Sequence, residues 1–472
     1  MNIARLVHPG FWFGKTPLEQ ALALAKRGVG GFCLYGGTRA EVAAFTQAVR
    51  AASPLKYLLI SADYEDGLGR WLPDAPLLPS NMALGAANDE QLSFEKGLLT
   101  ARQARSLGVD WVFAPVLDLA NNPLNPIVNT RSFGASPELV TRLARAFING
   151  LRQGGALNSI KHFPGHGDTS TDSHLALPVL HKTKEELLAK ELLPFKALLP
   201  LADSVMLGHL LLPKIDTENP ASLSPALARD LLRKQLNYTG CVLTDALLMK
   251  AIGDEKAAAW QALQAGADIL LVPQNPAELI DFLEQKQVPQ EILNHSLATQ
   301  EQLGARTDQT QRPSQEEAFS ANDFGYRTAQ KSICTQGNFT PIEVGQTVHY
   351  LEIGNETAQS AAAFLNTLQK HGINLQKYEG KAENLLVLCF RRYQAFQGKI
   401  LLEENDVEKL QTAFQHVPNS TCIFFASPWA LPADLPVQTK LFTFSPAPEF
   451  QVTAAEILLG VRPAQGKLPI TA

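Results

Sequence analysis

Short apolar runs alternate with longer amphipathic stretches along residues 1–305, and this alternation gives the first expectation about the fold. Runs rich in β-branched and aromatic residues predict buried strands, while apolar residues at a spacing of three or four predict helices. Eight strand-like runs occur, at Ile3–Val7, Gly31–Tyr35, Tyr57–Ala62, Trp111–Pro115, Ala156–Lys161, Asp203–Gly208, Cys241–Asp245 and Asp268–Val272. The helical stretches between them include Leu18–Arg27, Ser93–Leu107, Pro137–Gln153 and Pro225–Leu236. This repeated order predicts an α/β fold with an N-terminal (β/α)8 TIM-like barrel.

The pattern changes after residue 305. The segment 306–345 begins with polar, Gln-rich residues without apolar periodicity, so we expect a linker there. Residues 346–472 again alternate strands and helices, which predicts a smaller three-layer α/β sandwich domain at the C-terminus. Its expected strands are Val348–Ile353, Asn384–Phe390, Thr421–Ala426 and Lys440–Phe444, and its expected helices are Ala358–Lys370, Asn405–Phe414 and Ala454–Leu459.

Composition excludes several classes of partner. With 472 residues, 45% hydrophobic, 18% charged and a net charge of -5, the chain is typical of a globular protein of two domains without a basic surface for nucleic acid. No apolar run is long enough to span a membrane, and the N-terminus lacks the apolar segment of a signal peptide. The five scattered cysteines are typical of reduced core thiols. We therefore expect a cytoplasmic protein, while its oligomeric state stays open.

Polar side chains follow five of the predicted strands, where each strand ends. Asp63, Asp118, His209 and Asp245 take such positions, and Lys161 with His162 ends a fifth strand. Barrel enzymes carry their chemistry at the carboxyl ends of the strands. We therefore expect these groups to converge on one pocket.

The segment KHFPGHGDTSTDSH, residues 161–174, has the highest density of reactive side chains. It holds three of the ten histidines and two aspartates around a Pro-Gly turn, which ends the preceding strand. A metal site formed by His162, His166, Asp172 and His174 is one interpretation, although no HExxH or CxxC spacing supports it. Turn capping by the histidines is a second.

Acid/base chemistry is the third interpretation and the one we favour. Asp172 and His174 are two residues apart, so both side chains can lie on one side of an extended segment. An aspartate bound to one imidazole nitrogen fixes the tautomer and raises the pKa of the histidine, which can then transfer a proton near neutral pH. We expect no metal and no cofactor.

The motif KHFPGHG followed by DSH resembles the β-N-acetylglucosaminidase branch of glycoside hydrolase family 3, in its two-domain form. Further segments are similar to the family in the same order and span nearly the whole chain: DYEDGLGR, FAPVLDL, NTRSFG, ASLSP, VLTDALLM, AGADILLVP and GKLP. The resemblance implies a barrel followed by a second domain. We place the barrel at residues 1–305, the linker at 306–345 and the second domain at 346–472.

The resemblance also implies roles for individual residues. Asp245 would be the nucleophile, His174 the general acid/base and Asp172 the residue that orients it. The substrate would be bound by Asp63, Arg70, Arg131, Lys161 and His162. Two departures bear on this assignment: Ala246 stands where the branch often has a second acidic residue, and DYEDGLGR departs from the usual Asp-x-Glu-Gly-Gly, which places the role of Arg70 in question.

Structural roles compete with several of these assignments. Asp245 could cap a helix starting at Ala246. Arg131 could bridge two loops, and Lys161 could pair with Asp118. His166 could serve the turn or bind a ligand, and His209 could be a pocket or a core residue.

The predicted function is that of a retaining exo-β-N-acetylglucosaminidase, with a cell-wall muropeptide as the expected substrate and chito-oligosaccharides as the alternative. A family 3 β-glucosidase usually takes its acid/base glutamate from the second domain and lacks the KHFPGHG loop. A β-N-acetylglucosaminide phosphorylase would use phosphate in place of water. A glycan-binding protein without activity is an alternative of a different class, and a metal-dependent hydrolase is a further one.

Overall fold

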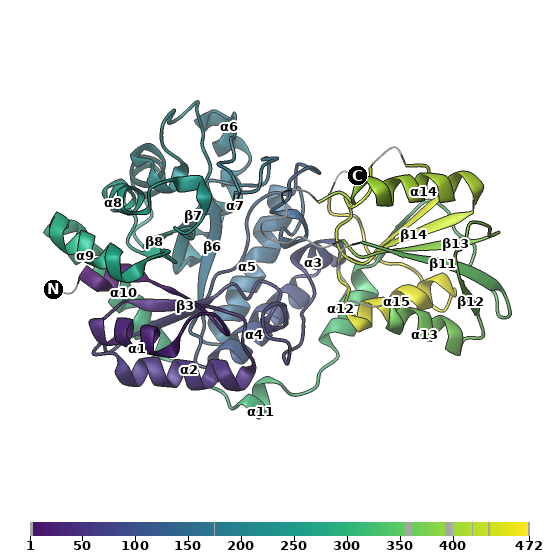
Figure 1. Cartoon of the computed structure of the whole chain (residues 1–472), viewed down its shortest axis with the longest axis horizontal. Helices are drawn as coiled ribbons and strands as arrows, with labels where there is room; N and C mark the ends of the chain where they lie inside the picture. Colours follow the sequence, from purple (N-terminus) through teal and green to yellow (C-terminus); the bar gives the residue numbers. More distant parts are fainter. Residues whose placement is uncertain are drawn as a thin grey trace.

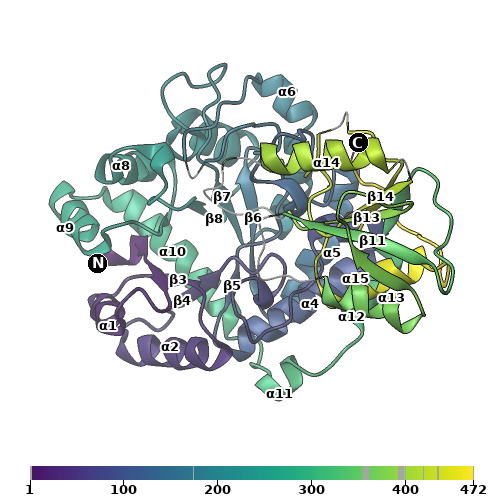
Figure 2. The same cartoon turned by 45° about the vertical axis from the view of Figure 1, so that its right-hand side comes forward.

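The computed structural model describes residues 3–173, 175–354, 361–391, 398, 400–417, 419–432 and 435–470. It has two lobes, the N-terminal lobe larger than the C-terminal one (Figure 1). The turned view shows the strands of the larger lobe around a common centre, with helices outside them (Figure 2). The predicted barrel is confirmed.

Within the described residues, the barrel strands β1 to β9 take eight positions. β1 (Val7–His8) and β2 (Gly10–Trp12) share the first position, because Pro9 interrupts that strand. The sheet runs parallel in sequence order from β2 to β8. β9 pairs with β1, and Ile269 just before β9 bridges Leu243 of β8, which joins the two edges of the sheet. The other strands are β3 (Gly31–Tyr35), β4 (Leu59–Ala62), β5 (Trp111–Val112), β6 (Leu157–Phe163), β7 (Ser204–Leu207), β8 (Cys241–Thr244) and β9 (Leu270–Leu271).

The first predicted strand needs a correction. Residues Ile3–Leu6 form the 3-10 helix η1, and the strand begins only at Val7. Ala4 and Leu6 are buried while Ile3 and Arg5 are partly exposed, and η1 contacts helices α9 and α10. Such alternating burial suits both a short strand and a tight helical turn, so the pattern of four residues could not separate them.

Helices surround the barrel and are fixed by close packing. They are α1 (Leu18–Arg27), α2 (Arg39–Ala52), α3 (Asn81–Ala87), α4 (Glu90–Ser106), α5 (Pro137–Gln153), α6 (Lys184–Ala189), α7 (Leu192–Leu198), the π-helix η6 (Ala226–Gln235), α8 (Glu255–Ala265), α9 (Pro276–Lys286) and α10 (Gln290–Thr307). The predicted helix Pro225–Leu236 is thus η6. In α4 and α5, Gly97 and Gly150 face the partner backbone, where an added Cβ would lie 2.2 Å from the oxygen of Phe147 and 2.0 Å from that of Phe94. These glycines let the two helices pack closely.

The second domain has three layers. In the described part of the chain its sheet has six strands in the order β10-β15-β14-β13-β11-β12, with only β10 antiparallel. Helix α14 lies on one side of the sheet, and α13 and α15 lie on the other (Figure 1). The strands are β10 (Cys334–Gln336), β11 (Thr347–Ile353), β12 (Asn374–Lys377), β13 (Leu385–Cys389), β14 (Ser420–Phe424) and β15 (Thr439–Phe442). The helices are α13 (Ala362–Lys370), α14 (Glu404–His416) and α15 (Pro448–Leu458). The start of the predicted helix Ala358–Lys370 lies outside the described residues.

The segment 306–345 contains regular structure. It carries α11 (Gln315–Ala318), α12 (Phe324–Ser332) and the strand β10, which pairs with β15. The segment GKLP near the C-terminus returns to the barrel: Lys467 N–H donates to the oxygen of Ala86, and Ala135 N–H donates to the oxygen of Pro469. The proposed boundaries at 305 and 345 stay predictions.

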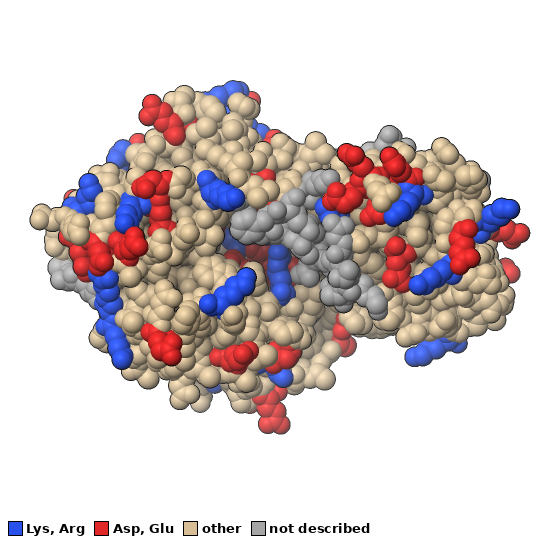
Figure 3. All heavy atoms as spheres, in the orientation of Figure 1, with Lys and Arg blue, Asp and Glu red and all other residues tan. Residues whose placement is uncertain are grey.

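Two further expectations concern surface and thiols. All five cysteines are free and buried, as expected. Basic and acidic side chains are interspersed over the face shown in Figure 3. Among the residues that the structure describes, no helix combines the length and the apolarity needed to cross a bilayer.

Candidate active site

Most of the predicted site residues lie at the carboxyl ends of the barrel strands. Asp63 follows β4, Lys161 and His162 belong to β6, and Asp245 follows β8. Arg131 ends the short helix η3 (Asn129–Arg131) in the connection after β5. The parallel order of these strands brings all of them to one end of the barrel.

A continuous set of hydrogen bonds and ion pairs joins four of these side chains to Glu65 and Asp118. The ammonium group of Lys161 lies 2.6 Å from Asp63 Oδ1 and 2.6 Å from Glu65 Oε1. Glu65 accepts two bonds from Arg131, each 2.8 Å long. Arg131 in turn donates to His162 Nε2 at 3.3 Å. The set ends at Asp118, whose Oδ2 lies 2.6 Å from His162 Nδ1. We call these six residues, Asp63, Glu65, Asp118, Arg131, Lys161 and His162, the polar chain.

Glu65 is the functional residue that the sequence analysis missed. It is 2% exposed, and although burial opposes ionisation, Arg131 and Lys161 hold the pKa of Glu65 well below its ordinary value. Its carboxylate joins the two cations and thereby fixes both. The available signal was its place two residues after Asp63, in the segment DYEDGLGR.

Lys161 pairs with Asp63 and Glu65, so the predicted alternative of a Lys161–Asp118 pair is wrong. Burial lowers the pKa of Lys161, but the two carboxylates outweigh it and the pKa lies above its ordinary value. The side chain of Asp63 is 26% exposed while that of Lys161 is 1% exposed. Asp63 thus keeps part of its carboxylate exposed while Lys161 holds one of its oxygens.

The hydrogen bonds define the tautomer of His162. A guanidinium group only donates, so Nε2 must accept from Arg131 and the proton lies on Nδ1, which donates to Asp118. Asp118 is fully buried and also accepts from the backbone N–H of His166 at 2.6 Å. Although burial acts to raise it, the two histidines and these hydrogen bonds lower the pKa of Asp118.

The loop after β6 is tied to the connection that follows β5. The side-chain amide of Asn125 donates to the backbone oxygens of His166 and Gly167, at 2.8 and 3.3 Å, and to Thr169 Oγ1 at 3.2 Å. His166 is buried, and its Nδ1 lies 2.8 Å from Thr169 Oγ1. Burial lowers the pKa of His166 to about 4. The imidazole is therefore neutral at physiological pH, and its contacts support the turn role.

Asp172 is buried near the end of this loop, where the second domain reaches it. The backbone N–H of Gly398 lies 3.3 Å from Asp172 Oδ2. His174 lies outside the described residues, so the Asp172–His174 pair stays a prediction.

Asp245 does not begin a helix. Its Oδ1 accepts from the adjacent Ala246 N–H at 2.8 Å, and the next α-helix, α8, starts at Glu255 with Asp254 as its cap. The helix-cap interpretation is therefore wrong.

His209 is fully buried. Its Nε2 lies 3.1 Å from the backbone oxygen of Ala246, and its Nδ1 lies 2.7 Å from Ser222 Oγ. His209 is thus a core histidine that holds the segment just after Asp245.

Arg70 lies beside a second charged group. Its Nη1 is 3.8 Å from Asp66 Oδ2, and Asp66 also pairs with the buried Lys96 at 3.1 Å. Lys96 donates to Asn81 Oδ1 at 2.7 Å, and Asn81 donates to the oxygen of Arg131 at 2.7 Å. This group contacts the polar chain through the bond from Asn81 to the backbone of Arg131. The sugar-binding role of Arg70 stays a prediction.

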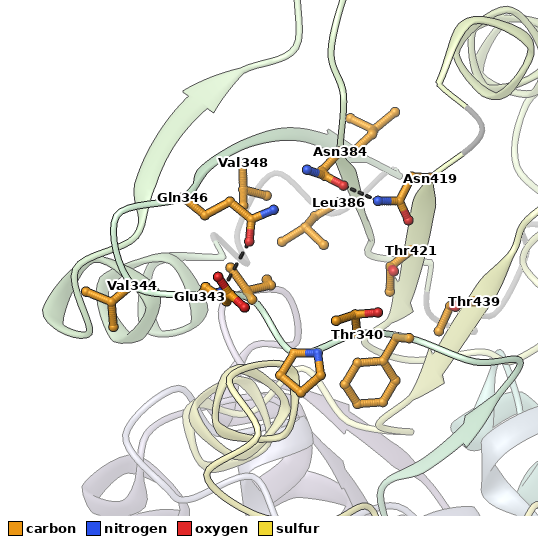
Figure 4. A pocket seen from close by; sticks show the side chains of 14 residues that line it. Thr340, Glu343, Val344, Gln346, Val348, Asn384, Leu386, Asn419, Thr421 and Thr439 are labelled. Carbon is orange, nitrogen blue, oxygen red and sulfur yellow. Dashed lines mark hydrogen bonds between the residues drawn. The ribbon is translucent and has the colours of Figure 1, made fainter.

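A separate pocket lies in the second domain, at the amino ends of β11, β13, β14 and β15 (Figure 4). It has a volume of about 520 Å³ and is lined by amides, threonines and apolar residues, including Gln346, Asn384, Asn419 and Thr421. Glu343 is its single carboxylate among the lining residues, and none of the predicted site residues lines it. This chemistry suits no acid/base reaction.

Known proteins resemble both the sequence and the fold. Residues 2–301 match the family model described as Glycosyl hydrolase family 3 N terminal domain. A β-hexosaminidase of Methylococcus capsulatus is 36% identical over 271 residues, which cover 54% of this chain and 80% of the relative. A β-hexosaminidase of Bordetella avium is 37% identical over 274 residues, which cover 54% of this chain and 77% of the relative.

Two solved structures superpose over the whole chain. The family 3 β-N-acetylglucosaminidase from Paenibacillus sp. str. FPU-7 has a TM-score of 0.85 and 26% identity, covering 100% of this chain and 98% of the other. The β-glucoside phosphorylase BglX bound to 2FGlc has a TM-score of 0.91 and 24% identity, covering 100% and 93%. The second likeness concerns the fold alone.

Proposed function

Because the chain belongs to glycoside hydrolase family 3, we propose that it is a retaining exo-β-N-acetylglucosaminidase that removes terminal β-linked N-acetylglucosamine. The observation that carries this proposal is the polar chain at the carboxyl ends of the barrel strands, the end at which Asp245 also lies. The curated β-hexosaminidases that the chain resembles support a β-hexosaminide as the substrate. Membership of the family makes the chain a glycoside hydrolase, and the sugar and the mechanism are what we propose.

The reaction would proceed in two steps through an oxocarbenium-like transition state. In the first step Asp245 forms a bond to the anomeric carbon while the bond to the leaving oxygen breaks. Protonated His174, oriented by Asp172, gives its proton to that oxygen. In the second step His174 takes a proton from water, whose oxygen displaces Asp245. Two inversions restore the β configuration.

The polar chain would bind the sugar. The exposed carboxylate of Asp63 can accept bonds from ring hydroxyls, while Lys161 keeps it charged and in place. Arg131 and His162 are fixed by Glu65 and Asp118 before any sugar arrives, so little ordering is left for the binding step. We assign the hydroxyls and the N-acetyl group to Asp63, Arg131, Lys161 and His162.

The charges around the site favour water over phosphate as the acceptor. Among the described residues, Lys161, Arg131, Arg70 and Lys96 each lie within 4 Å of a carboxylate. A phosphate dianion is best bound by cations whose charge is not already balanced. We therefore propose hydrolysis, with a muropeptide as the natural substrate and a chito-oligosaccharide as the competing one.

Release of nitrophenol from aryl β-N-acetylglucosaminide and aryl β-glucoside, in phosphate-free buffer at neutral pH, tests the proposal. Faster turnover of the acetamido sugar is expected, and addition of phosphate should not increase it. Preference for the glucoside would identify a β-glucosidase, acceleration by phosphate would identify a phosphorylase, and no turnover would favour a binding protein. Loss of activity with a chelator would identify a metal-dependent hydrolase.

The nucleophile can be tested separately. Asp245→Gly should abolish turnover, and added azide should restore it by entering the space of the lost carboxylate. The product would then be the α-glycosyl azide, because only one inversion takes place. Asp230→Asn, which changes an exposed carboxylate on η6, is the matched control. Rescue with a β product, or unchanged activity, would contradict the role of Asp245.

A further inference from the structure

Three aromatic side chains lie at the same end of the barrel as Asp63. Trp12 ends β2, Tyr35 ends β3, and Trp71 follows the short helix η2 (Leu68–Arg70) beyond β4. The rings of Trp12 and Tyr35 are stacked, with centroids 4.8 Å apart and planes inclined by 8°. Trp71 meets Tyr35 edge to face at 5.2 Å and 72°. We call these three residues the aromatic cluster.

The backbone fixes two members of the aromatic cluster. An added Cβ on Gly10 would lie 2.4 Å from a ring carbon of Trp12, so the indole lies directly over this glycine. The indole N–H of Trp71 donates to the backbone oxygen of Asp63 at 2.9 Å. The ring of Trp71 is therefore fixed to the backbone at Asp63.

The aromatic cluster extends from Asp63 toward Asp245. Trp12, Tyr35 and Ala246 are all partly buried and pack on the same apolar group inside the barrel. Burial raises the pKa of Tyr35, and neighbouring Cys33, Asp63 and Asp245 add to the rise. All three residues are partly exposed.

We propose that the aromatic cluster is the contact surface for the glycosyl ring itself, so that Trp71 and Trp12 determine specificity for a pyranose. A pyranose has C–H groups on its faces, and these pack well on the electron-rich face of an aromatic ring. Asp63 then binds hydroxyls at one end of the sugar while Asp245 reaches the anomeric carbon at the other. Ala246, which replaces the expected acidic residue, keeps the surface next to Asp245 apolar. This inference rests on the proposed function.

Binding of N-acetylglucosamine to the full-length chain, measured by calorimetry, tests the proposal together with kcat and KM for the aryl substrate. Trp71→Leu and Trp12→Leu should each weaken binding about tenfold and should raise KM more than they lower kcat. Trp71→Phe keeps an aromatic ring but loses the N–H and part of the aromatic face, so its binding should lie between those of the wild type and Trp71→Leu. Trp260→Phe, on α8, is the matched control.

Folded Leu variants that bind the sugar as tightly as the wild type would overturn the proposal. A wild type that cleaves a different β-pyranoside would contradict the proposed N-acetylglucosaminidase function. The binding of that sugar to the same variants would still test the aromatic cluster. A wild type that binds no sugar would overturn both.

Discussion

Arg131 and Glu65 face each other through two parallel hydrogen bonds of 2.8 Å in the buried centre of the polar chain. A paired guanidinium and carboxylate out of water are stable only together, because either one alone is an uncompensated charge. Glu65 also serves Lys161, so one acidic residue supports two cations that the proposed function requires.

Glu65→Gln should therefore damage both stability and binding. The amide keeps the shape but leaves Arg131 and Lys161 undercompensated, so we expect a loss of about 3–5 kcal/mol in the free energy of unfolding and an increase in KM. Urea unfolding and steady-state kinetics would measure the two effects. Glu278→Gln, an exposed acid that pairs with Lys256, is the matched control. Wild-type stability in Glu65→Gln would show that the pair contributes little.

Asn125→Ala should loosen the loop that carries the proposed acid/base. The amide nitrogen shares its two hydrogens among three acceptors in the segment 166–169, and these bonds, worth about 1 kcal/mol per hydrogen, would be lost together with those that Oδ1 accepts from Ile127 and Val128. We expect kcat to fall about tenfold or more, with faster proteolysis of the loop. Asn374→Ala removes a comparable bond to Gly345 in the second domain and should leave kcat unchanged. Equal kcat in both variants would mean that the loop keeps its position without Asn125.

His209→Ala should lower kcat without much change in KM. His209 acts through the carbonyl of Ala246, so its loss would let the segment with Asp245 move relative to the sugar. Ser222→Ala removes only the partner of Nδ1 and should have a smaller effect. The temperature of unfolding would report any general damage. A pure increase in KM in His209→Ala would instead place His209 in substrate binding.

The fold stability should decline in mild acid because of buried neutral histidines. The pKa of His166 falls from 6.5 to about 4 in the folded chain, and that of His8 falls from 6.5 to about 3. Between those values the unfolded chain binds protons that the folded chain does not. The stabilisation is thus complete above pH 6.5 and is lost as the pH falls through this range, by up to about 1.4 kcal/mol per pH unit for each histidine.

His166→Asn should accordingly flatten the dependence of the unfolding temperature on pH between about 6.5 and 5, a window above the range where carboxylates take up protons. His371→Asn, an exposed histidine next to α13, is the matched control. An unchanged slope in His166→Asn would mean that the imidazole is charged in the folded chain.

Most of the barrel could be predicted because seven of its eight strand positions, β3 to β9, are short apolar runs separated by helical stretches. Because Asp63, Lys161 and His162 lie at the ends of predicted parallel strands, their location at one end of the barrel could also be predicted. The bonds of Glu65 could not be predicted in the same way, because they depend on how η3 turns Arg131 back toward β4. The pairing of β10 with β15 was hidden for a related reason: a strand of three residues has too little pattern to reveal a partner about a hundred residues away.

The polar chain also has a consequence for how this protein can evolve. Each member is compensated by its neighbours, so a change at Arg131 alone would remove the bidentate partner of Glu65, and a change at Asp118 alone would remove the acceptor of His162 Nδ1. Single substitutions at such positions are therefore expected to be poorly tolerated. Where natural relatives differ at one of them, we expect a second difference at the residue that touches it, so that the two substitutions have been inherited as a pair.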